Sequence, residues 1–272
     1  MERIWTPADA ALWIAVPDDD DDKYSRGVVG FVTGSAKYPG AAVLGVESAT
    51  RTGVGMVRYL GAGRPTRLVL QRRPEAVSAE GRVQAWVLGS GQDPEKLDEL
   101  TTEFLDTALA QAVPMVLDGG ALGRRADAAG PVLLTPHARE LSRLIDVGVD
   151  TILADPDAAA QRAARELDAT VLLKGHTTTI ARPDGSLLHA RSAPAWLATA
   201  GAGDALAGIL GALLATHHQQ LEDDPGVLAQ LAATGAVLHG LAAERASDGG
   251  PLTILDLAAA LPAVIRELLR IP

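Results

Sequence analysis

The segment with the clearest chemical potential is a run of small residues that leads into an apolar stretch. Gly201, Ala202 and Gly203 precede Asp204, and the apolar residues 205–211 follow. Main-chain N–H groups at such a helix start can approach a phosphate closely, and the helix dipole adds to the attraction. Asp204 would lie at the mouth of this anion site, where a carboxylate can take a proton from a hydroxyl that attacks a phosphoryl group. The alternative is that Asp204 only caps the helix.

A second candidate segment follows a predicted strand at 170–173. It offers a lysine, a flexible glycine and two threonine hydroxyls, which are groups that could hold the phosphates or the sugar of a nucleotide. The five residues are Lys174, Gly175, His176, Thr177 and Thr178. A simple turn between two strands is the alternative interpretation of the same residues.

A third segment, residues 135–140, follows another predicted strand and opens a helix. With Thr135 as the N-cap and Pro136 as the first helical residue, Glu140 has no capping role. With His137 as the cap, Glu140 would complete a capping box. His137 and Glu140 lie three residues apart and share a helical face, so one could contact a substrate while the other orders a Mg²⁺ ion or its water.

Three further loops follow predicted strands and are rich in glycine. They are residues 34–40, residues 89–91 and the segment that begins at Asp118 and continues with Gly119 and Gly120. A carboxylate at a strand end is a common catalytic placement, but it is also a common helix cap. The glycine loops could equally be tight turns.

Short apolar runs alternate with helical patterns along most of the chain. We expect strands at 28–33, 56–60, 67–71, 85–88, 115–117, 132–134 and 170–173, a hairpin of 177–182 with 186–189, and helices at 7–14, 41–52, 95–112, 155–167, 204–216, 226–244 and 254–269. This alternation predicts an α/β fold with a mainly parallel central sheet and helices on both faces. Ligands bind such sheets beyond the carboxyl ends of the strands, where the segments that follow predicted strands, 33–40, 89–92, 118–121, 135–140 and 174–178, would lie.

Composition narrows the class of protein further. The 272 residues carry 24 basic and 34 acidic side chains, a net charge of −10, which disfavours general binding to nucleic acids or anionic membranes. Cysteine is absent, so disulfides and thiolate metal sites are excluded. No segment looks like a targeting signal or a transmembrane span, and we expect a cytoplasmic protein. Residues 1–22, which include the acidic run 18–22, are expected to form an N-terminal arm, and 23–272 a single domain.

Several common catalytic motifs are missing from the sequence. It contains no phosphate-binding P-loop, no dinucleotide-binding glycine fingerprint between a strand and a helix, no nucleophilic-serine elbow and no zinc-binding H-E-x-x-H. The adjacent His217 and His218 are expected to lie at a solvated helix end.

Taken together and in this order, the loops resemble the ADP- or ATP-dependent NAD(P)H-hydrate dehydratase family, which has a ribokinase-like fold. The resemblance covers residues 23–269. The segments that carry it are 33–42, 51–55, 88–91, 116–122, 134–140, 172–178 and 197–204. Each segment alone is weak evidence for the family, but the seven segments together in this order are specific to it.

The resemblance implies an enzyme that repairs damaged cofactor. NADH or NADPH hydrated at C6 of the nicotinamide ring, in its (S)-form, is phosphorylated on that hydroxyl, and phosphate then leaves. Bacterial-type members mostly use ADP and yield AMP. The implied contacts to the hydrated dinucleotide are Ala41, Gly91, His137 and Asp204, with Asp204 as the base. The implied contacts to the adenine nucleotide are Lys174, Gly175, His176, Thr177, Thr178 and Gly203.

The resemblance also implies Mg²⁺, a homotetramer and a separate epimerase in the same pathway. The sequence departs from the family at Ser90, where the pattern usually has proline, and at Gly120, where it often has a second aspartate. Two alternatives remain open: a vitamin-precursor kinase of the same fold, and a non-catalytic nucleotide sensor. The choices between ADP and ATP, and between the hydrates of NADH and NADPH, also remain open.

Overall fold

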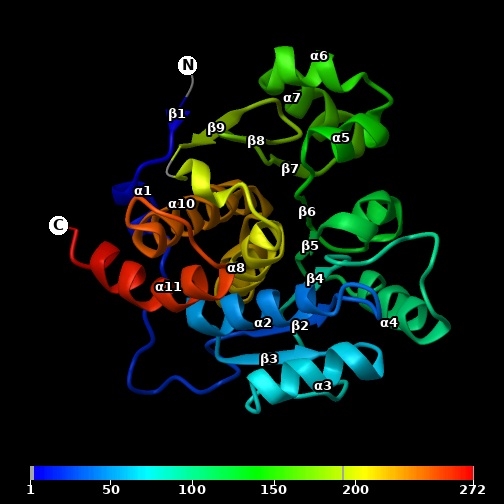
Figure 1. The fold of residues 1–272 in the computed structure, drawn as a ribbon, viewed down its shortest axis with the longest axis vertical. Helices are drawn as coiled ribbons and strands as arrows, with labels where there is room; N and C mark the ends of the chain where they lie inside the picture. The colour runs from blue at the N-terminus through cyan, green and yellow to red at the C-terminus, as the bar shows by residue number, and fades with distance from the viewer. Residues whose placement is uncertain (1–2, 192, 272) are drawn as a thin grey trace.

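In the computed structural model, which describes residues 3–191 and 193–271, a nine-stranded sheet forms the centre of the protein (Figure 1). The strands are β1 (Arg3–Ile4), β2 (Val28–Val32), β3 (Met56–Tyr59), β4 (Ala85–Leu88), β5 (Met115–Leu117), β6 (Val132–Leu134), β7 (Thr170–Leu173), β8 (Thr178–Ala181) and β9 (Leu187–Ala190). Their spatial order is β1-β9-β8-β7-β6-β5-β4-β2-β3. Strand β8 pairs antiparallel with β7 and β9, and the other recorded pairs are parallel. The predicted α/β fold with a mainly parallel sheet is confirmed.

Helices cover both faces of this sheet. They are α1 (Pro7–Ala11), α2 (Gly40–Thr52), α3 (Gly63–Arg72), α4 (Glu99–Leu109), α5 (Ala138–Ile145), α6 (Val149–Ala154), α7 (Pro156–Leu167), α8 (Ala202–Thr216), α9 (His218–Asp223), α10 (Leu228–Ser247) and α11 (Ile254–Leu268), with short 3₁₀ turns η1 (Gly119–Asp127), η2 (Ala195–Leu197) and η3 (Pro225–Val227). Helices α2, α8, α10 and α11 lie on one side of the sheet, and α4, α5 and α7 lie on the other (Figure 1).

The two layers of core follow from the alternation of side chains along each strand. In β2, Val29 and Phe31 belong to the core beneath α2, α8 and α10, whereas Val28 and Val32 belong to the core beneath α4 and α5. All four side chains are fully buried. A strand buried on both faces reads as an unbroken apolar run, which is why β2 was predictable from sequence.

Helix α8 is held unusually close to α2. A side chain at Gly208 of α8 would collide with the backbone of Gly45 in α2, and a side chain at Gly211 would collide with Val87 of β4. Gly208 lets the backbones of the two helices approach directly, and Gly211 lets α8 lie close to the sheet. The close crossing fixes where α8 begins, and therefore where the Gly201–Asp204 segment lies.

The expectation of a strand at 67–71 is wrong, because this segment forms the second half of helix α3. Pro65 and Val69, four residues apart, are buried, while Arg67 and Gln71 are exposed. That spacing places the buried residues on one helical face. A run of three apolar residues is too short to distinguish a strand from a helix by periodicity.

The expectation that His217 and His218 lie at a solvated helix end is also wrong. Only 7% and 8% of their surfaces are exposed. Their Nδ1 atoms bond to the carbonyl oxygens of Leu213 and Ala215 at the junction of α8 and α9. The two buried rings therefore bond to carbonyl groups at the end of α8, where α9 begins.

The described part of the N-terminal segment is built into the fold. Strand β1 pairs with β9 at one edge of the sheet. Trp5 is 4% exposed, and its Nε1 donates a hydrogen bond to Thr234 of α10 at 3.1 Å. Residues 1–2 of the expected arm lie outside the described residues.

One described helix, spanning Pro225–Ser247, is long and apolar enough to cross a membrane. Within its most apolar window, 83% of the residues are buried inside the protein. It contacts α8, α11 and the sheet. Its apolar character is therefore explained by its position as a core helix.

A buried carboxylate, Glu47 of α2, ties α2 to α3. Its side chain is fully buried and pairs with Arg51, Arg72 and Arg73. Burial alone would raise the pKa of Glu47, but the three guanidinium groups outweigh this effect and lower it to about 2. A depressed pKa means that the ionised carboxylate stabilises the folded state.

We predict that Glu47→Gln lowers the free energy of unfolding at pH 7 by about 3 kcal/mol, because it leaves a buried ion network without its anion. The difference from the parent should shrink as pH falls from 4.5 toward about 2, where Glu47 itself becomes protonated. Urea unfolding at several pH values measures both effects. Glu75→Gln is the matched control, because Glu75 is 53% exposed and its one recorded ion pair among residues 3–191 and 193–271 is with Arg73. Equal losses in the two variants would contradict the role of Glu47.

Candidate active site

The carboxyl ends of three neighbouring strands bring the candidate polar groups together. Asp118 follows β5, Thr135 follows β6 and Lys174 follows β7. The Lys174 Nζ atom lies 2.8 Å from the Asp118 Oδ1 atom, which makes a partly buried ion pair between residues 56 positions apart. Adjacent parallel strands end at the same edge of the sheet, so groups distant in sequence meet there.

The Asp118 carboxylate accepts hydrogen bonds from two hydroxyl groups in addition to its ion pair with Lys174. Ser90 Oγ donates to its Oδ2 at 2.9 Å, and Thr135 Oγ1 donates to its Oδ1 at 2.8 Å. Burial acts to raise the pKa of Asp118, but the charge of Lys174 and the three donated hydrogen bonds lower it overall. Asp118 is therefore a fixed negative charge at the base of the site.

Thr135 is not the N-cap of α5, contrary to the first of the two sequence interpretations. The cap is His137, whose Nδ1 accepts a hydrogen bond from the Glu140 backbone N–H at 3.2 Å. Glu140 Oε2 in turn accepts from the His137 backbone N–H at 2.8 Å, which completes the capping box. The hydroxyl of Thr135 is used by Asp118 instead, and that long-range bond decided between the alternatives.

Lys174 lies within reach of further carboxylates. Its Nζ atom is 3.8 Å from Glu140 Oε2, and its backbone N–H donates to the carbonyl of Pro136 at 2.9 Å. Burial acts to lower the pKa of Lys174, but Asp118, Glu140 and Asp204 together raise it. The ammonium group is thus kept charged.

Asp204 is the third residue of α8 and is not its cap. The N-cap is Gly201, which has the left-handed conformation at φ 91° that glycine adopts without strain. Burial and the charge of Asp118 raise the pKa of Asp204 to about 6, and Lys174 opposes this shift. A carboxylate with a pKa near 6 is a stronger base than an ordinary aspartate and is still ionised at neutral pH.

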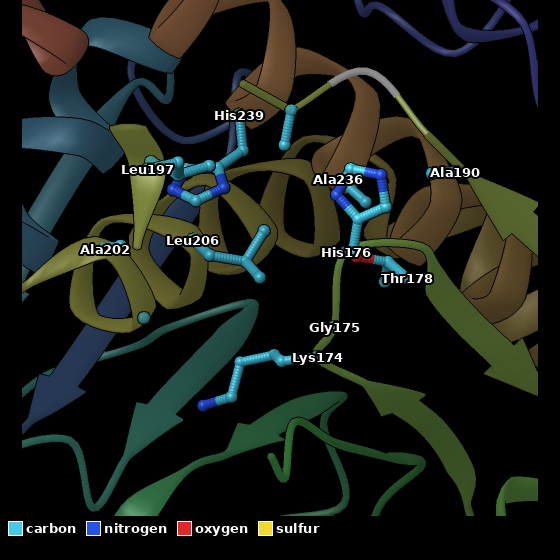
Figure 2. Close-up of a pocket in the computed structure, with 12 residues that line it drawn as sticks. Lys174, Gly175, His176, Thr178, Ala190, Leu197, Ala202, Leu206, Ala236 and His239 are labelled. Atoms are coloured by element: carbon cyan, nitrogen blue, oxygen red, sulfur yellow. The ribbon is translucent and has the colours of Figure 1, made fainter. Parts of the chain in front are cut away.

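Between Lys174 and the start of α8 lies a cavity of about 150 Å³ (Figure 2). Its polar end is formed by Lys174, Gly175 and Gly203, and its other walls are mainly apolar. A Cβ atom placed on Gly203 would lie 3.4 Å from Lys174 Nζ, so the glycine keeps this end open. His176 and Thr178 also line the cavity, while Thr177 faces a neighbouring cleft.

Ala41 and Gly91 lie against each other in the structure. Ala41 is 6% exposed at the start of α2, and a side chain on Gly91 would collide with its Cβ. Gly91 has φ +67°, so the loop after β4 requires glycine there. A larger cleft of about 760 Å³ begins beside this loop and is lined by Gln92, Gly120 and Glu140 among others.

The described residues contain no group of three or more His, Asp or Glu side chains that could hold a metal ion by themselves. Glu140 Oε2 is engaged by the capping box, and Glu140 Oε1 is 3.6 Å from His137 Nε2. These side chains do not fit an all-protein Mg²⁺ cage. Among the described residues Glu140 Oε1 has no recorded hydrogen bond, so besides its contact with His137 it can meet water around a Mg²⁺ ion that arrives on nucleotide phosphates, the usual way this ion is held.

Comparisons with known proteins agree with this fold and site. The structure matches a ribokinase-like superfamily protein from Enterococcus faecalis with a TM-score of 0.82 at 23% identity, over 98% of this chain and 96% of that one. It matches the crystal structure of an ADP/ATP-dependent NAD(P)H-hydrate dehydratase from Bacillus subtilis, co-crystallised with ATP/Mg²⁺, with a TM-score of 0.87 at 28% identity, over 98% and 99% of the two chains. The protein therefore has a ribokinase-like fold.

The sequence comparisons are more specific. A family model described as NAD(P)H-hydrate dehydratase matches residues 29–261. An ADP-dependent (S)-NAD(P)H-hydrate dehydratase from Neisseria meningitidis is 34% identical over 83% of this chain and 79% of its own length. A bifunctional NAD(P)H-hydrate repair enzyme from Corynebacterium glutamicum is 38% identical over 91% of this chain and 48% of its own length. The chain belongs to the NAD(P)H-hydrate dehydratase family, and it spans about half the length of the bifunctional relatives that it matches.

Two residues of the site were missed as site residues in the sequence. Asp118 was noted as a carboxylate at a strand end, but its pairing with Lys174 depends on the order of β5, β6 and β7. The signal that could have selected it was its position directly after a buried strand, which it shares with Thr135 and Lys174. His239 lines the cavity from the middle of α10, where no local pattern marks it.

We predict that Asp118→Asn lowers the pKa of Asp204 below about 6, since it removes a negative charge and leaves Lys174 free to favour the ionised form. Carbon-13 NMR titration of the Asp204 carboxyl group measures this, and the spectrum also reports folding. Asp106→Asn removes an exposed carboxylate that pairs with Arg124 and has no recorded effect on the Asp204 pKa, so it should leave the titration unchanged. An unchanged or raised Asp204 pKa in the Asp118 variant would contradict the electrostatic account.

Proposed function

We propose that this protein repairs hydrated NADH and NADPH by ADP-dependent dehydration of the (S)-form, giving NAD(P)H, AMP and phosphate. The observation that carries the proposal is the position of Asp204: a carboxylate with a pKa raised to about 6, at the start of a glycine-opened helix beside Lys174. Two relatives named ADP-dependent (S)-NAD(P)H-hydrate dehydratase support the choice of reaction.

The cavity and its surroundings support a division into two binding regions. The nucleotide occupies the cavity of Figure 2, with phosphates toward Lys174 and Gly203 and with residues 175–178 along its side. The hydrated dinucleotide contacts Ala41, Gly91 and His137, and the larger cleft is lined by Gln92 and Glu140, which are close to Gly91 and His137 in sequence. Asp204, directly after Gly203 of the cavity, serves both ligands.

In this arrangement, Asp204 accepts the proton of the C6 hydroxyl as its oxygen attacks the terminal phosphorus of ADP. The new O–P bond forms as the bond from phosphorus to AMP breaks. Lys174 and the N–H groups at the start of α8 stabilise the negative charge on the phosphoryl oxygens. The C6–O bond then breaks, phosphate leaves with the bonding electrons, and loss of a proton from C5 restores the ring double bond. A bound Mg²⁺ ion would neutralise phosphate charge, with Glu140 holding its water.

We assign three further properties to the same proposal. The relatives named bifunctional support an epimerase that acts in the same pathway. The core position of the membrane-length helix supports a soluble protein, for which we propose the cytoplasm. A homotetramer is the assembly that the family resemblance implies.

The assay that tests the function mixes the protein with hydrated NADH, Mg²⁺ and either ADP or ATP. Recovery of dihydronicotinamide absorbance, matched by AMP and phosphate in equal amounts when ADP is used, supports the dehydratase. Accumulation of a stable phosphorylated product would indicate a small-molecule kinase instead. Nucleotide binding without any turnover would indicate a sensor.

We predict that Asp204→Asn lowers turnover by ~10²–10⁴-fold, the usual contribution of a positioned general base. The folded-state pKa of about 6 lies above the ordinary value of 3.8, so the stability contributed by Asp204 is lost as pH rises through 6. At pH 8 the variant should therefore melt at the same temperature as the parent or higher. Steady-state kinetics and thermal melting measure the two effects, and a well-folded variant with near-parent turnover would contradict the assignment.

We predict that His137→Asn weakens binding of the hydrated dinucleotide while ADP affinity changes less than about twofold. Asparagine retains N-capping, so the variant keeps α5, whereas His137→Ala should also lose about 1 kcal/mol of stability. Calorimetric titration of each ligand separately measures the effect. If His137→Asn weakened both ligands equally, His137 would not belong to the dinucleotide region.

A further inference from the structure

His239 is a cavity residue that the reaction described above does not use. It lies in the middle of α10, and its ring reaches toward Leu197, Ala202 and Leu206 (Figure 2). Only 7% of the residue is exposed. It lines the cavity on the side away from the ammonium group of Lys174.

The hydrogen bonding of this imidazole is incomplete. Within the described part of the chain, His239 Nε2 is buried and has no hydrogen-bond partner. Burial lowers the pKa of His239 to about 4, a hydrogen bond to the Ala202 backbone opposes this, and the charge of Lys174 lowers it further. The ring is therefore neutral at the pH of any cytoplasmic reaction.

A neutral imidazole has one N–H group and one lone pair. A backbone group that raises the pKa of histidine is a carbonyl, since the carbonyl accepts the ring N–H. The Ala202 carbonyl favours the form of the neutral ring that is protonated on Nδ1, and in that form the unpartnered Nε2 carries the lone pair. Buried acceptors are normally satisfied, so an unsatisfied one in a ligand cavity suggests that the ligand supplies the donor.

Polar and apolar residues are arranged in the cavity as the phosphates and the base are arranged in a nucleotide. Lys174, Gly175 and Gly203 form an end suited to phosphates, while Leu197, Leu206 and Ala236 provide apolar walls suited to a flat base. His176, the other imidazole of the cavity, belongs to the exposed turn beyond Lys174. His239 is on the apolar wall, where it would meet the edge of the base.

We propose that His239 accepts a hydrogen bond from the exocyclic amine of the nucleobase, so that the cavity selects a 6-amino purine over a 6-oxo purine. This inference rests on the proposed function, because it takes the ligand of the cavity to be an adenine nucleotide. A 6-oxo purine presents an oxygen lone pair to the imidazole lone pair at this point, and a buried acceptor facing another acceptor is unfavourable.

Calorimetric titration of the full chain with ADP and with inosine diphosphate tests the proposal. The parent should bind ADP at least about tenfold more tightly than inosine diphosphate, the value of one hydrogen bond. His239→Phe keeps a flat ring without the lone pair, so it should lose about tenfold in ADP affinity and most of the discrimination. His239→Gln can turn its amide toward either ligand, so it should keep ADP affinity and bind inosine diphosphate better than the parent does. His218→Gln, which removes a buried histidine of α9, is the control and should preserve the parent ratio.

Inorganic pyrophosphate separates base recognition from a structural role. It should bind the parent and His239→Phe equally, because it occupies only the phosphate end. A parallel loss of pyrophosphate and ADP affinity would overturn the proposal and assign His239 to positioning the start of α8. A His239→Phe variant that binds ADP and retains the parent ratio would overturn this proposal alone. A parent protein that binds neither ADP nor ATP would overturn both this proposal and the proposed function.

Discussion

The site depends on one ammonium group placed among carboxylates. Lys174 Nζ lies 2.8 Å from Asp118 and 3.8 Å from Glu140, and the charge of Asp204 also raises the pKa of Lys174. Each partner comes from a different element, so the sheet order and the close α2–α8 crossing must both be correct for the charges to meet. The pKa values of Asp118 and Asp204 are shifted in opposite directions. The pKa of Asp118 is lowered, so it stays ionised, while the pKa of Asp204 is raised toward protonation. Paired groups with pKa values driven apart are typical of acid–base sites.

This arrangement costs stability where it serves chemistry. A carboxylate with a raised pKa is less stable in the folded protein than in water, and an imidazole with an unpartnered buried nitrogen is also unfavourable. His239 lines the cavity, and Asp204 directly follows Gly203, which also lines it. Elsewhere the buried charges are well matched, as at Glu47 with its three arginines. The contrast is the one expected when an active site is destabilised relative to the scaffold that supports it.

Much of the fold could be predicted from sequence because buried parallel strands such as β2, β5 and β6 are short unbroken apolar runs. The same logic placed Lys174 at the carboxyl edge of the sheet before any contact was known, whereas Asp204 was found from the small residues that open its helix. Local sequence patterns did not predict the correct structure where two different structures were equally compatible with the same residues. Residues 67–71 fit a strand or a helix, and either Thr135 or His137 could cap α5 until the bond from Thr135 to Asp118 excluded the first. His239 gave no local signal, because a single histidine in an apolar helix looks like any other core residue.

The central claim is that Asp204 activates the substrate hydroxyl, which attacks phosphorus before the carbon–oxygen bond breaks. Labelling that C6 hydroxyl of hydrated NADH with oxygen-18 and following the label after reaction with ADP tests this most directly. The account predicts that the label appears in the released inorganic phosphate, with one labelled oxygen for each NADH recovered. Label released into water, with phosphate formed only from ADP hydrolysis, would contradict the account.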